Sequence, residues 1–362
     1  MIVYREKKGV GLKETLGNIM ENKSHQSPYN YVKVDRDSVF QHIGNEKLVS
    51  LLKQMVMIRN LEVRAESAYL QGNIGGFFHA YMGQEAIQTA CVEVFGQNNW
   101  WSASYRCHAL AYLTGVSVQD IMNELFGKSN GNAMGRGGSM HLYSERMLGG
   151  FGIVGGQIPI AIGAALSIKY LKKKDETSLC FLGDGAVAQG TFHESINLAV
   201  LWDLPCVIVV ENNKWGMGTA VNRAVAVEPI AEKFAKCFGI EGYTLDGMDL
   251  LACYEGFKQI KESSIKNRKP ILVEVITERF RGHSISDPAQ YRTKECLKAA
   301  MESDPILKLK NDLIEKGVLT EEQYKEIDKK AKDEVVASLK IAEESPWPDP
   351  IVLEEGVYKE EE

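Results

Sequence analysis

The sequence predicts an α/β protein built on one doubly wound parallel sheet, with helical additions at its N- and C-terminal ends. Two apolar runs, Leu179–Leu182 and Val207–Val210, are separated by a stretch with helical spacing, which is the pattern of a βαβ unit. A later apolar run, Pro270–Ile276, is a clear strand that follows further helical stretches. Strands that alternate with helices are typical of a parallel sheet with helices on its faces.

Polar residues stand directly after both runs of the βαβ unit. The first run leads into GDG at 183–185 and the second into ENN at 211–213. Because the parallel strands of such a unit end at the same edge of the sheet, we expect Asp184 and Asn213 to lie side by side. Carboxylate and amide oxygens are hard ligands that suit magnesium, which proteins often share with a bound phosphate. The sequence therefore predicts a magnesium site at this edge.

Length and charge place the chain among ordinary globular proteins. Its 362 residues can bury one or two cores, and a net charge of -6 with scattered Lys and Arg gives no basic face for nucleic acid or an anionic membrane. No run of eighteen apolar residues appears, so we expect no membrane span. The N-terminal 26 residues lack the apolar core of a secretory signal and carry acids early, which predicts a cytoplasmic protein.

The cysteines support the same interpretation. They are odd in number and form no CxxC pair, which predicts reduced thiols rather than disulfides or a zinc site. Most of them are expected to be small core residues. They stand at positions 91, 107, 180, 206, 237, 253 and 296.

The chain ahead of the βαβ unit begins with residues 1–43, which are polar and weakly patterned. We interpret them as an extension that either packs on a partner or forms a mobile arm. From Lys47 onward, apolar residues at helical spacing predict one long helix that stops at Gly72. His79 then stands in a glycine-flanked aromatic turn before another helical segment. A lone histidine is more often structural, so the pattern alone assigns it no function.

An aromatic strand or turn, Asn99–His108, carries Tyr105 and Arg106. A guanidinium can clamp a phosphate through two parallel hydrogen bonds, and a neighbouring phenol can add a third. Equally, Arg106 can be a surface charge, and the pattern leaves both interpretations open.

Glycine becomes dense between residues 127 and 163, which indicates tight turns or a close approach of the backbone to a ligand. Residues 150–155 spell GxGxxG, the dinucleotide-binding pattern. That pattern requires a preceding apolar strand, and the residues before it, Met140–Arg146, do not form one; nor does an acidic residue end the next strand at the required spacing. We therefore predict no NAD site but a glycine loop that touches a ligand, followed by a small-residue helix over Ile160–Leu166.

The α/β rhythm continues after the βαβ unit, with an expected helix at Ala231–Ala235, strand at Gly242–Leu245, helix at Leu250–Ile265 and strand at Pro270–Ile276. The last strand leads into TERFRGHSISDPAQYR, a long polar connection headed by His283 and Ser284. Long connections at the carboxyl end of a strand are often functional.

The part of the chain beyond Lys294 is charged and helical. Asp304-Pro305 predicts the start of one helix, and Thr320–Gln323 predicts a capping box at the start of another. Three prolines exclude a helix from the tail, which we expect to lie extended on the surface. These features divide the chain into an N-terminal extension (1–43), an α/β domain (44–293), a helical region (294–345) and an extended tail (346–362).

The GDG motif, followed after 26 residues (186–211) by Asn212-Asn213, matches the thiamine diphosphate signature. Further collinear matches are FFHAYMGQEA, YRCHAL, GRGGSMHLY, GIVGGQIPIAIGAA, GDGAVAQGTFHE, LPCVIVVENNKWGMGT and RGHSISDPAQYR. From about Lys47 to Tyr291 the chain resembles the alpha subunits of the thiamine diphosphate-dependent first component of 2-oxo acid dehydrogenase complexes, most closely those of the pyruvate type. The resemblance implies that the α/β domain is the diphosphate-binding and magnesium-binding half of that family's fold.

The resemblance also implies the ligands of Mg²⁺. Asp184 and Asn213 match the two side-chain ligands, and the main-chain carbonyl of Trp215 matches a third protein ligand. Relatives often carry tyrosine at this last position, but a main-chain ligand should tolerate the change.

The implied contacts to the thiamine diphosphate itself come from several segments. The grip on its diphosphate is formed by Tyr105, Arg106, Gly185, Ala186 and His283. Main-chain atoms of Gly152 and Val154 match contacts to the aminopyrimidine ring. His79 matches an active-site histidine, so the resemblance reverses the interpretation drawn from the pattern alone. His79 and His283 are the predicted catalytic residues.

The activity that the resemblance implies is oxidative decarboxylation of pyruvate, a 2-oxo acid, with the cofactor as electron sink. The acetyl group then passes to a lipoyl group of the acyltransferase component. In this family the glutamate that activates the aminopyrimidine belongs to a beta subunit, and we find no second doubly wound half in these 362 residues. We therefore expect an α₂β₂ heterotetramer with active sites between the two kinds of chain.

Alternatives remain open from the sequence: the same chemistry on branched-chain 2-oxo acids, cleavage of acetoin, or a non-catalytic assembly subunit. The loop around His283 looks more like the pyruvate type, and intact magnesium ligands argue against a mere scaffold. Ser284 stands where animal mitochondrial relatives carry a phosphorylated serine. Gln290 and Ala220 replace two further such serines, so we interpret Ser284 as a hydrogen-bonding loop residue.

Overall fold

The computed structural model describes residues 29–356 of the chain. The chain divides into two units, residues 1–30 and 31–362, and every described helix and strand belongs to the second. The predictions made for residues 1–28 and for the end of the tail lie outside the described residues. The assignment of domain boundaries at residues 43, 293 and 345 stays a prediction.

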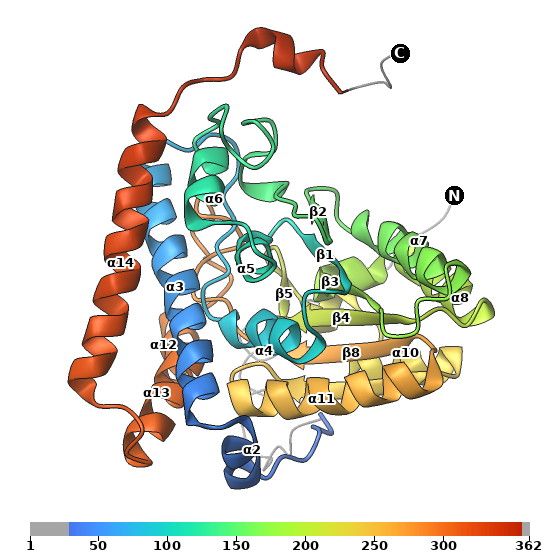
Figure 1. Cartoon of the computed structure of the whole chain (residues 1–362). Coiled ribbons are helices and arrows are strands. Elements are labelled where there is room, and N and C mark those ends of the chain that lie inside the picture. The colour runs from blue at the N-terminus through green and yellow to red at the C-terminus, as the bar shows by residue number, and fades with distance from the viewer. Residues whose placement is uncertain (1–28, 357–362) are drawn as a thin grey trace, which may run out of the picture. The chain divides into compact units, whose positions relative to one another are not determined.

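A six-stranded parallel sheet forms the centre of the second unit (Figure 1), in the order β2-β1-β3-β4-β8-β7. The strands are β1 (Trp100–Ser104), β2 (Met147–Phe151), β3 (Ser178–Gly183), β4 (Cys206–Asn212), β7 (Glu241–Asp246) and β8 (Ile271–Ile276). Each adjacent pair is parallel. A separate hairpin joins β5 (Trp215–Gly216) to β6 (Thr219–Ala220).

Helices cover both faces of the sheet, which confirms the doubly wound prediction. Alternate residues of β4 belong to two different cores: Val207 and Val209 pack with one, and Ile208 and Val210 with the other. This double burial explains the continuous apolar run in the sequence. The first core is covered by α3 (Asn45–Leu70), α4 (Glu85–Phe95), α5 (His108–Leu113), α6 (Val118–Leu125), α11 (Leu250–Asn267), α13 (Pro305–Glu315) and α14 (Glu321–Glu344). The second is covered by α7 (Gln157–Tyr170), α8 (Gly190–Leu201) and α10 (Ile230–Phe238).

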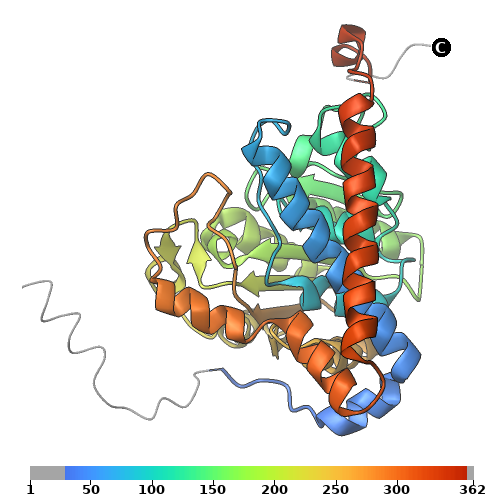
Figure 2. The ribbon, with the colours of Figure 1, turned by 90° about the vertical axis from the view of Figure 1, so that its left-hand side faces the viewer.

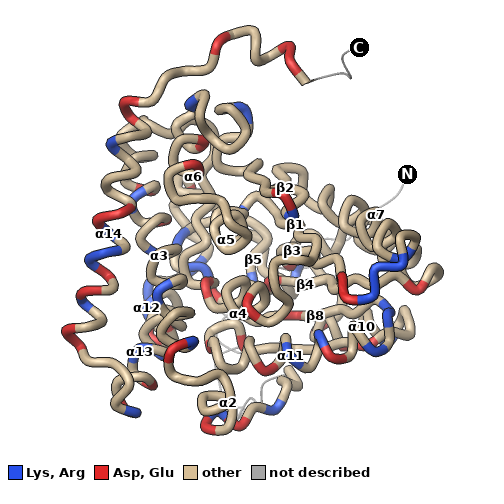
Figure 3. Tube along the Cα trace, in the orientation of Figure 1, with Lys and Arg blue, Asp and Glu red and all other residues tan. Residues whose placement is uncertain are grey.

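The C-terminal helices form one layer with the long N-terminal helix. α14 runs beside α3 (Figure 2), and its residues Ala331 and Val335 are buried in the shared core. The predicted capping box at Thr320 and Gln323 is present, and Asp304 caps α13 with Pro305 in its first turn. Both signs of charge alternate along the outer side of α14 (Figure 3). α12 (Lys294–Glu302) precedes these two helices.

Several local predictions need correction. The extension contains a helix, α2 (Arg36–Ile43), capped by Asp35. The small-residue helix is longer than predicted, since α7 spans Gln157–Tyr170. A 3₁₀ turn at Pro350–Leu353 interrupts the extended tail. The short α9 (Val221–Ala224) was not predicted.

The GxGxxG stretch needs a correction of its own. β2 runs directly into it and α7 follows it, so the expectation that no strand precedes the glycines is wrong. The second reason against an NAD site holds, because Asp175 and Glu176 precede β3 rather than end it.

The cysteines behave as the sequence predicts. All seven are free and five of them are buried, while Cys237 and Cys296 are exposed. Within residues 29–356 no helix is long and apolar enough to cross a membrane. The cytoplasmic location stays a prediction.

Candidate active site

A cavity of about 340 Å³ opens at the carboxyl ends of β1, β3, β4 and β8. β2 lies on one side of β1 and β3 lies on the other, so the order in which successive strands join the sheet reverses at β1. Tyr105 follows β1 and Asp184 follows β3, which places the cavity at this switch point, where open parallel sheets bind ligands. Its lining includes Ser104, Tyr105, Val154, Gly155, Gln157, Gly183, Asp184, Gly185, Ala186, Asn213, Trp215, Arg279 and His283.

Most of the predicted site residues meet in this cavity. Eight of them line it: Tyr105, Val154, Asp184, Gly185, Ala186, Asn213, Trp215 and His283. Three do not, namely His79, Arg106 and Gly152. The roles that the resemblance implies for all eleven stay predictions.

Asp184 is the buried acid of the cavity. Its side chain is 1% exposed, and its Oδ2 atom has no hydrogen-bond partner. Burial raises the pKa of Asp184 to about 6, while the positive charge of Arg279 and the peptide N–H groups of Asp184 and Asn213 oppose that rise. A buried carboxylate oxygen without a partner is a group that a cation would complete.

Asn213 is held in a fixed orientation beside this acid. Its Nδ2 donates to Gln84 Oε1 at 3.0 Å, so the amide oxygen is turned away from that partner and accepts only a long bond from the Trp215 amide, 3.4 Å. The strand register brings the segments of Asp184 and Asn213 together, because Gly183 of β3 pairs with Glu211 of β4. Asp184 and Asn213 therefore follow paired strands, as the sequence predicted.

These atoms form a suitable set for a hard divalent cation. One carboxylate oxygen, one amide oxygen and the Trp215 carbonyl are all oxygen donors, as magnesium prefers. Among the described residues no group of three or more His, Cys, Asp or Glu side chains is placed to hold a metal ion. A magnesium site here would therefore depend on the amide and main-chain oxygens and on a bound phosphate. The residues present fit such a group.

Arg279 is a cavity residue that the sequence reasoning missed. It is 3% exposed and lines the cavity. Its guanidinium donates to the carbonyl of Trp215 at 3.0 Å, to that of Met217 at 3.2 Å and to the Tyr291 hydroxyl at 2.9 Å. Its Nε has no partner although it is buried. The residue stands just before the RGHSISDPAQYR match, so that motif did not draw attention to it.

Arg106 lies outside the lining of the cavity, and its predicted contact with the diphosphate stays a prediction. Its Nη1 donates to the carbonyl of Ala80 at 2.7 Å and its Nη2 to the carbonyl of His283 at 2.6 Å. The guanidinium thus joins the turn after His79 to the loop that carries His283. Arg106 is therefore neither a surface charge nor a residue that lines the cavity.

Three rings form a cluster beside the cavity. The ring of His79 lies 4.4 Å from that of Tyr105 and 5.1 Å from that of His283, centroid to centroid. Burial, followed by the positive charge of Arg106, lowers the pKa of His79 to about 3 and that of His283 to about 4. Both imidazoles are therefore neutral near pH 7. His79 Nδ1 is buried without a hydrogen-bond partner.

The loop after β8 is held by a carboxylate. Asp287 Oδ2 accepts from the amide of His283 and from the Tyr291 hydroxyl, each at 2.6 Å. The Ser284 hydroxyl lies 3.0 Å from that of Ser286, so Ser284 is the hydrogen-bonding loop residue that was predicted. The loop thereby holds His283 in the lining of the cavity.

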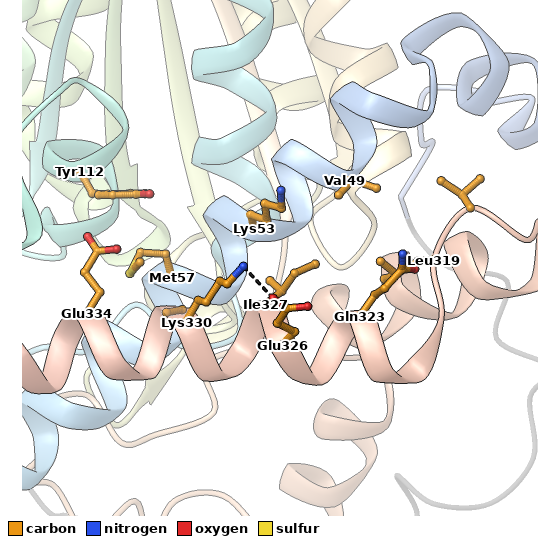
Figure 4. Close-up of a pocket in the computed structure, with 12 residues that line it drawn as sticks. Val49, Lys53, Met57, Tyr112, Leu319, Gln323, Glu326, Ile327, Lys330 and Glu334 are labelled. Atoms are coloured by element: carbon orange, nitrogen blue, oxygen red, sulfur yellow. Dashed lines mark ion pairs between the residues drawn. The ribbon is translucent and has the colours of Figure 1, made fainter.

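A second cavity, of about 430 Å³, lies between α3 and α14 (Figure 4). Its sides are apolar residues and charged groups such as Lys53 of α3 and Lys330 of α14. Lys330 pairs with Glu326 one turn away on its own helix, 2.8 Å apart. It contains no histidine, cysteine or unpartnered buried acid among its lining residues, so the sheet edge is the better candidate for chemistry.

Comparison with known proteins decides the family. Residues 53–351 match the family model described as dehydrogenase E1 component. The chain belongs to the dehydrogenase E1 component family. This confirms the resemblance drawn from the GDG and NN motifs, and membership of the dehydrogenase E1 component family implies the use of thiamine diphosphate.

Curated relatives cover nearly the whole chain. The pyruvate dehydrogenase E1 component subunit alpha of Rickettsia felis is 40% identical over 317 residues, which is 86% of this chain and 96% of the relative. The protein of the same name from Rhizobium meliloti is 41% identical over 300 residues, 82% of this chain and 86% of the relative. The mitochondrial one from Schizosaccharomyces pombe is 38% identical over 340 residues, 93% of this chain and 82% of the relative.

Proposed function

We propose that this chain is the alpha subunit of a pyruvate dehydrogenase first component. In this role it supports thiamine diphosphate-dependent oxidative decarboxylation of pyruvate and transfer of the acetyl group to a lipoyl group of the acyltransferase component. The observation that carries the proposal is the sheet-edge cavity in which the unpartnered Oδ2 of Asp184 meets Asn213, Arg279 and His283. Identities of about 40% to relatives of that name support it.

Magnesium and the diphosphate would be held by the polar end of this cavity. Asp184, Asn213 and the Trp215 carbonyl would supply the protein ligands of Mg²⁺. Arg279 would place a positive charge next to the phosphates. Gly185 and Gly216 approach so closely that a Cβ on Gly185 would lie 3.2 Å from the Gly216 Cα, so the wall there is bare backbone whose amides can face a phosphate.

The chemistry of the proposed reaction divides between cofactor and protein. Bound at this site, thiamine diphosphate supplies the electron sink for decarboxylation. The neutral ring of His283 lines the cavity and can donate or accept a hydrogen bond to a 2-oxo acid without adding charge, and the neutral ring of His79 lies next to it. Arg106 would orient both segments through its bonds to the Ala80 and His283 carbonyls.

We propose that a beta subunit completes the site within an α₂β₂ assembly. α7 and α8, which pack together over one face of the sheet, and the residue that follows α8 expose several large apolar side chains: Ile160, Leu166, Tyr170, Leu198, Leu201 and Trp202. An apolar surface of this kind is typical of a face that another chain covers. Leu201 is 68% exposed and Trp202 is 43% exposed.

Leu201→Glu is expected to block assembly with the beta subunit while leaving the alpha chain folded. The new charge would be buried in the proposed contact, where its desolvation opposes association. The matched control is Leu70→Glu, since Leu70 is 71% exposed at the end of α3, away from this surface. Size-exclusion chromatography with light scattering should show heterotetramer for the control only; equal assembly of both variants would refute the assignment of this face.

Rates on candidate substrates test the proposed reaction. The αβ complex is expected to turn over pyruvate with a higher kcat/KM than 2-oxoisovalerate or acetoin, in an assay that couples decarboxylation to an artificial electron acceptor. The isolated alpha chain should show essentially no turnover. A preference for 2-oxoisovalerate or acetoin would move the chain to a sister activity. Full turnover by the alpha chain alone would contradict the shared site.

A further inference from the structure

A buried acid on α6, far from the magnesium ligands in sequence, organises the glycine-rich loop. Glu124 is fully buried, and no ion pair in the described part of the chain includes it. Its carboxylate accepts four backbone N–H groups instead, from Ala133 (2.6 Å), Gly135 (3.0 Å), Gly137 (2.7 Å) and Gly138 (3.1 Å). The loop is thus folded around this side chain.

The same loop reaches the segment predicted to contact the aminopyrimidine ring. The carbonyl of Gly137 lies 2.9 Å from Nδ1 of His141, and the amide of Gly152 lies 3.3 Å from Nε2 of the same ring. Because the Gly152 amide donates, Nε2 must accept and Nδ1 must carry the proton, so one tautomer satisfies both bonds. A continuous chain of hydrogen bonds therefore runs from Glu124 through Gly137 and His141 to Gly152.

A second restraint holds the loop between Gly137 and His141. The hydroxyl of Ser139 lies 2.8 Å from Nε2 of His108, whose Nδ1 lies 3.0 Å from Glu62. All three side chains are buried. Loop movement is therefore limited on both sides of Gly137, and the hydrogen bonds through His141 connect this restrained loop to Gly152.

We propose that Glu124 and His141 are positioning residues for the ring half of the cofactor site. This inference rests on the proposed function, because it takes Gly152 and Val154 to hold the aminopyrimidine. Neither Glu124 nor His141 lines the cavity. The diphosphate half is built from other elements, since Asp184, Asn213 and Arg279 follow β3, β4 and β8. The two halves should therefore respond differently to substitutions in this chain of hydrogen bonds.

The test uses the αβ complex and two ligands that share the diphosphate. Glu124→Gln keeps the length of the side chain but replaces one accepting oxygen by an amino group that faces two loop amides. His141→Phe removes both ring nitrogens from an exposed position and should leave the fold intact. Calorimetry would measure the dissociation constants of thiamine diphosphate and of inorganic diphosphate, each with Mg²⁺. Both variants are expected to bind thiamine diphosphate about 10-fold more weakly and inorganic diphosphate as the unchanged complex does.

The control variant lies on α6, the helix that carries Glu124. Asp120→Asn makes the same acid-to-amide change at an exposed position of α6 and should alter neither constant. Equal weakening of both ligands in the His141 variant, or no weakening of either, would overturn the inference. If the unchanged complex binds inorganic diphosphate but not thiamine diphosphate, the proposed function fails first, and the positioning role with it.

Discussion

Replacing Asp184 by alanine is expected to weaken magnesium-dependent cofactor binding strongly. The carboxylate is 1% exposed and its Oδ2 has no other partner, so nothing nearby can substitute for it. Asp184 is also the only acid among the described residues that line the cavity. Its loss would therefore leave the positive charge of Arg279 without an opposite charge there. Changes to groups that only support metal ligands already lower metal affinity or activity by about 10- to 100-fold. We therefore expect the half-saturating concentration of thiamine diphosphate to rise at least about 100-fold.

The measurement is turnover of the αβ complex as thiamine diphosphate and Mg²⁺ are varied. Asp333→Ala is the control, since Asp333 is exposed in the middle of α14. The Asp333 variant should behave as the unchanged complex does. An Asp184→Ala complex with unchanged cofactor dependence would place the metal elsewhere.

Arg59→Met is expected to destabilise the protein more than any surface change. The guanidinium lies between two acids: its Nε is 2.5 Å from Glu85 Oε1 and its Nη1 is 2.8 Å from Asp304 Oδ2. It thereby joins α3 to the start of α4 and to the cap of α13. Glu85 is fully buried, and burial already raises its pKa. Removing the cation leaves that charge unpaired, which costs about 3–5 kcal/mol.

Urea unfolding of the αβ complex at one fixed protein concentration measures this loss, because subunit association contributes to the stability. Lys236→Met is the control: Lys236 also forms an ion pair, with Glu232 at 2.8 Å, but on an exposed helix turn. Exposed pairs contribute little, so this variant should unfold almost as the unchanged protein does. Similar midpoints for both variants would mean that the buried network does not hold these helices together.

The central strands were predictable because they are buried on both faces. β3, β4 and β8 appear as continuous apolar runs, and parallel pairing then requires Asp184 and Asn213 to meet at one edge. β2 has the sequence MLGGF, which offers only three apolar side chains around two glycines, and it is a strand because β1 pairs with it. Local pattern could not reveal a strand that depends on its neighbour.

The site was predictable where residues follow strands and less so where loops fold back. Asp184 and Asn213 follow their strands directly, so strand order determines their position. Arg279 reaches the Trp215 carbonyl only because the loop after β8 returns across the hairpin, a contact 64 residues away in sequence. The sequence could not show that the guanidinium of Arg106 donates to the carbonyls of Ala80 and His283. Such contacts depend on tertiary folding that periodicity does not encode.

Calorimetric titration of the unchanged αβ complex with thiamine diphosphate tests the central claim most directly. The claim is that this chain anchors the cofactor's diphosphate through magnesium at the sheet edge around Asp184. It predicts saturable binding of one cofactor per alpha chain when Mg²⁺ is present, and at least about 100-fold weaker binding when a chelator removes the metal. Binding of equal strength with and without the metal, or no binding at all, would contradict the account.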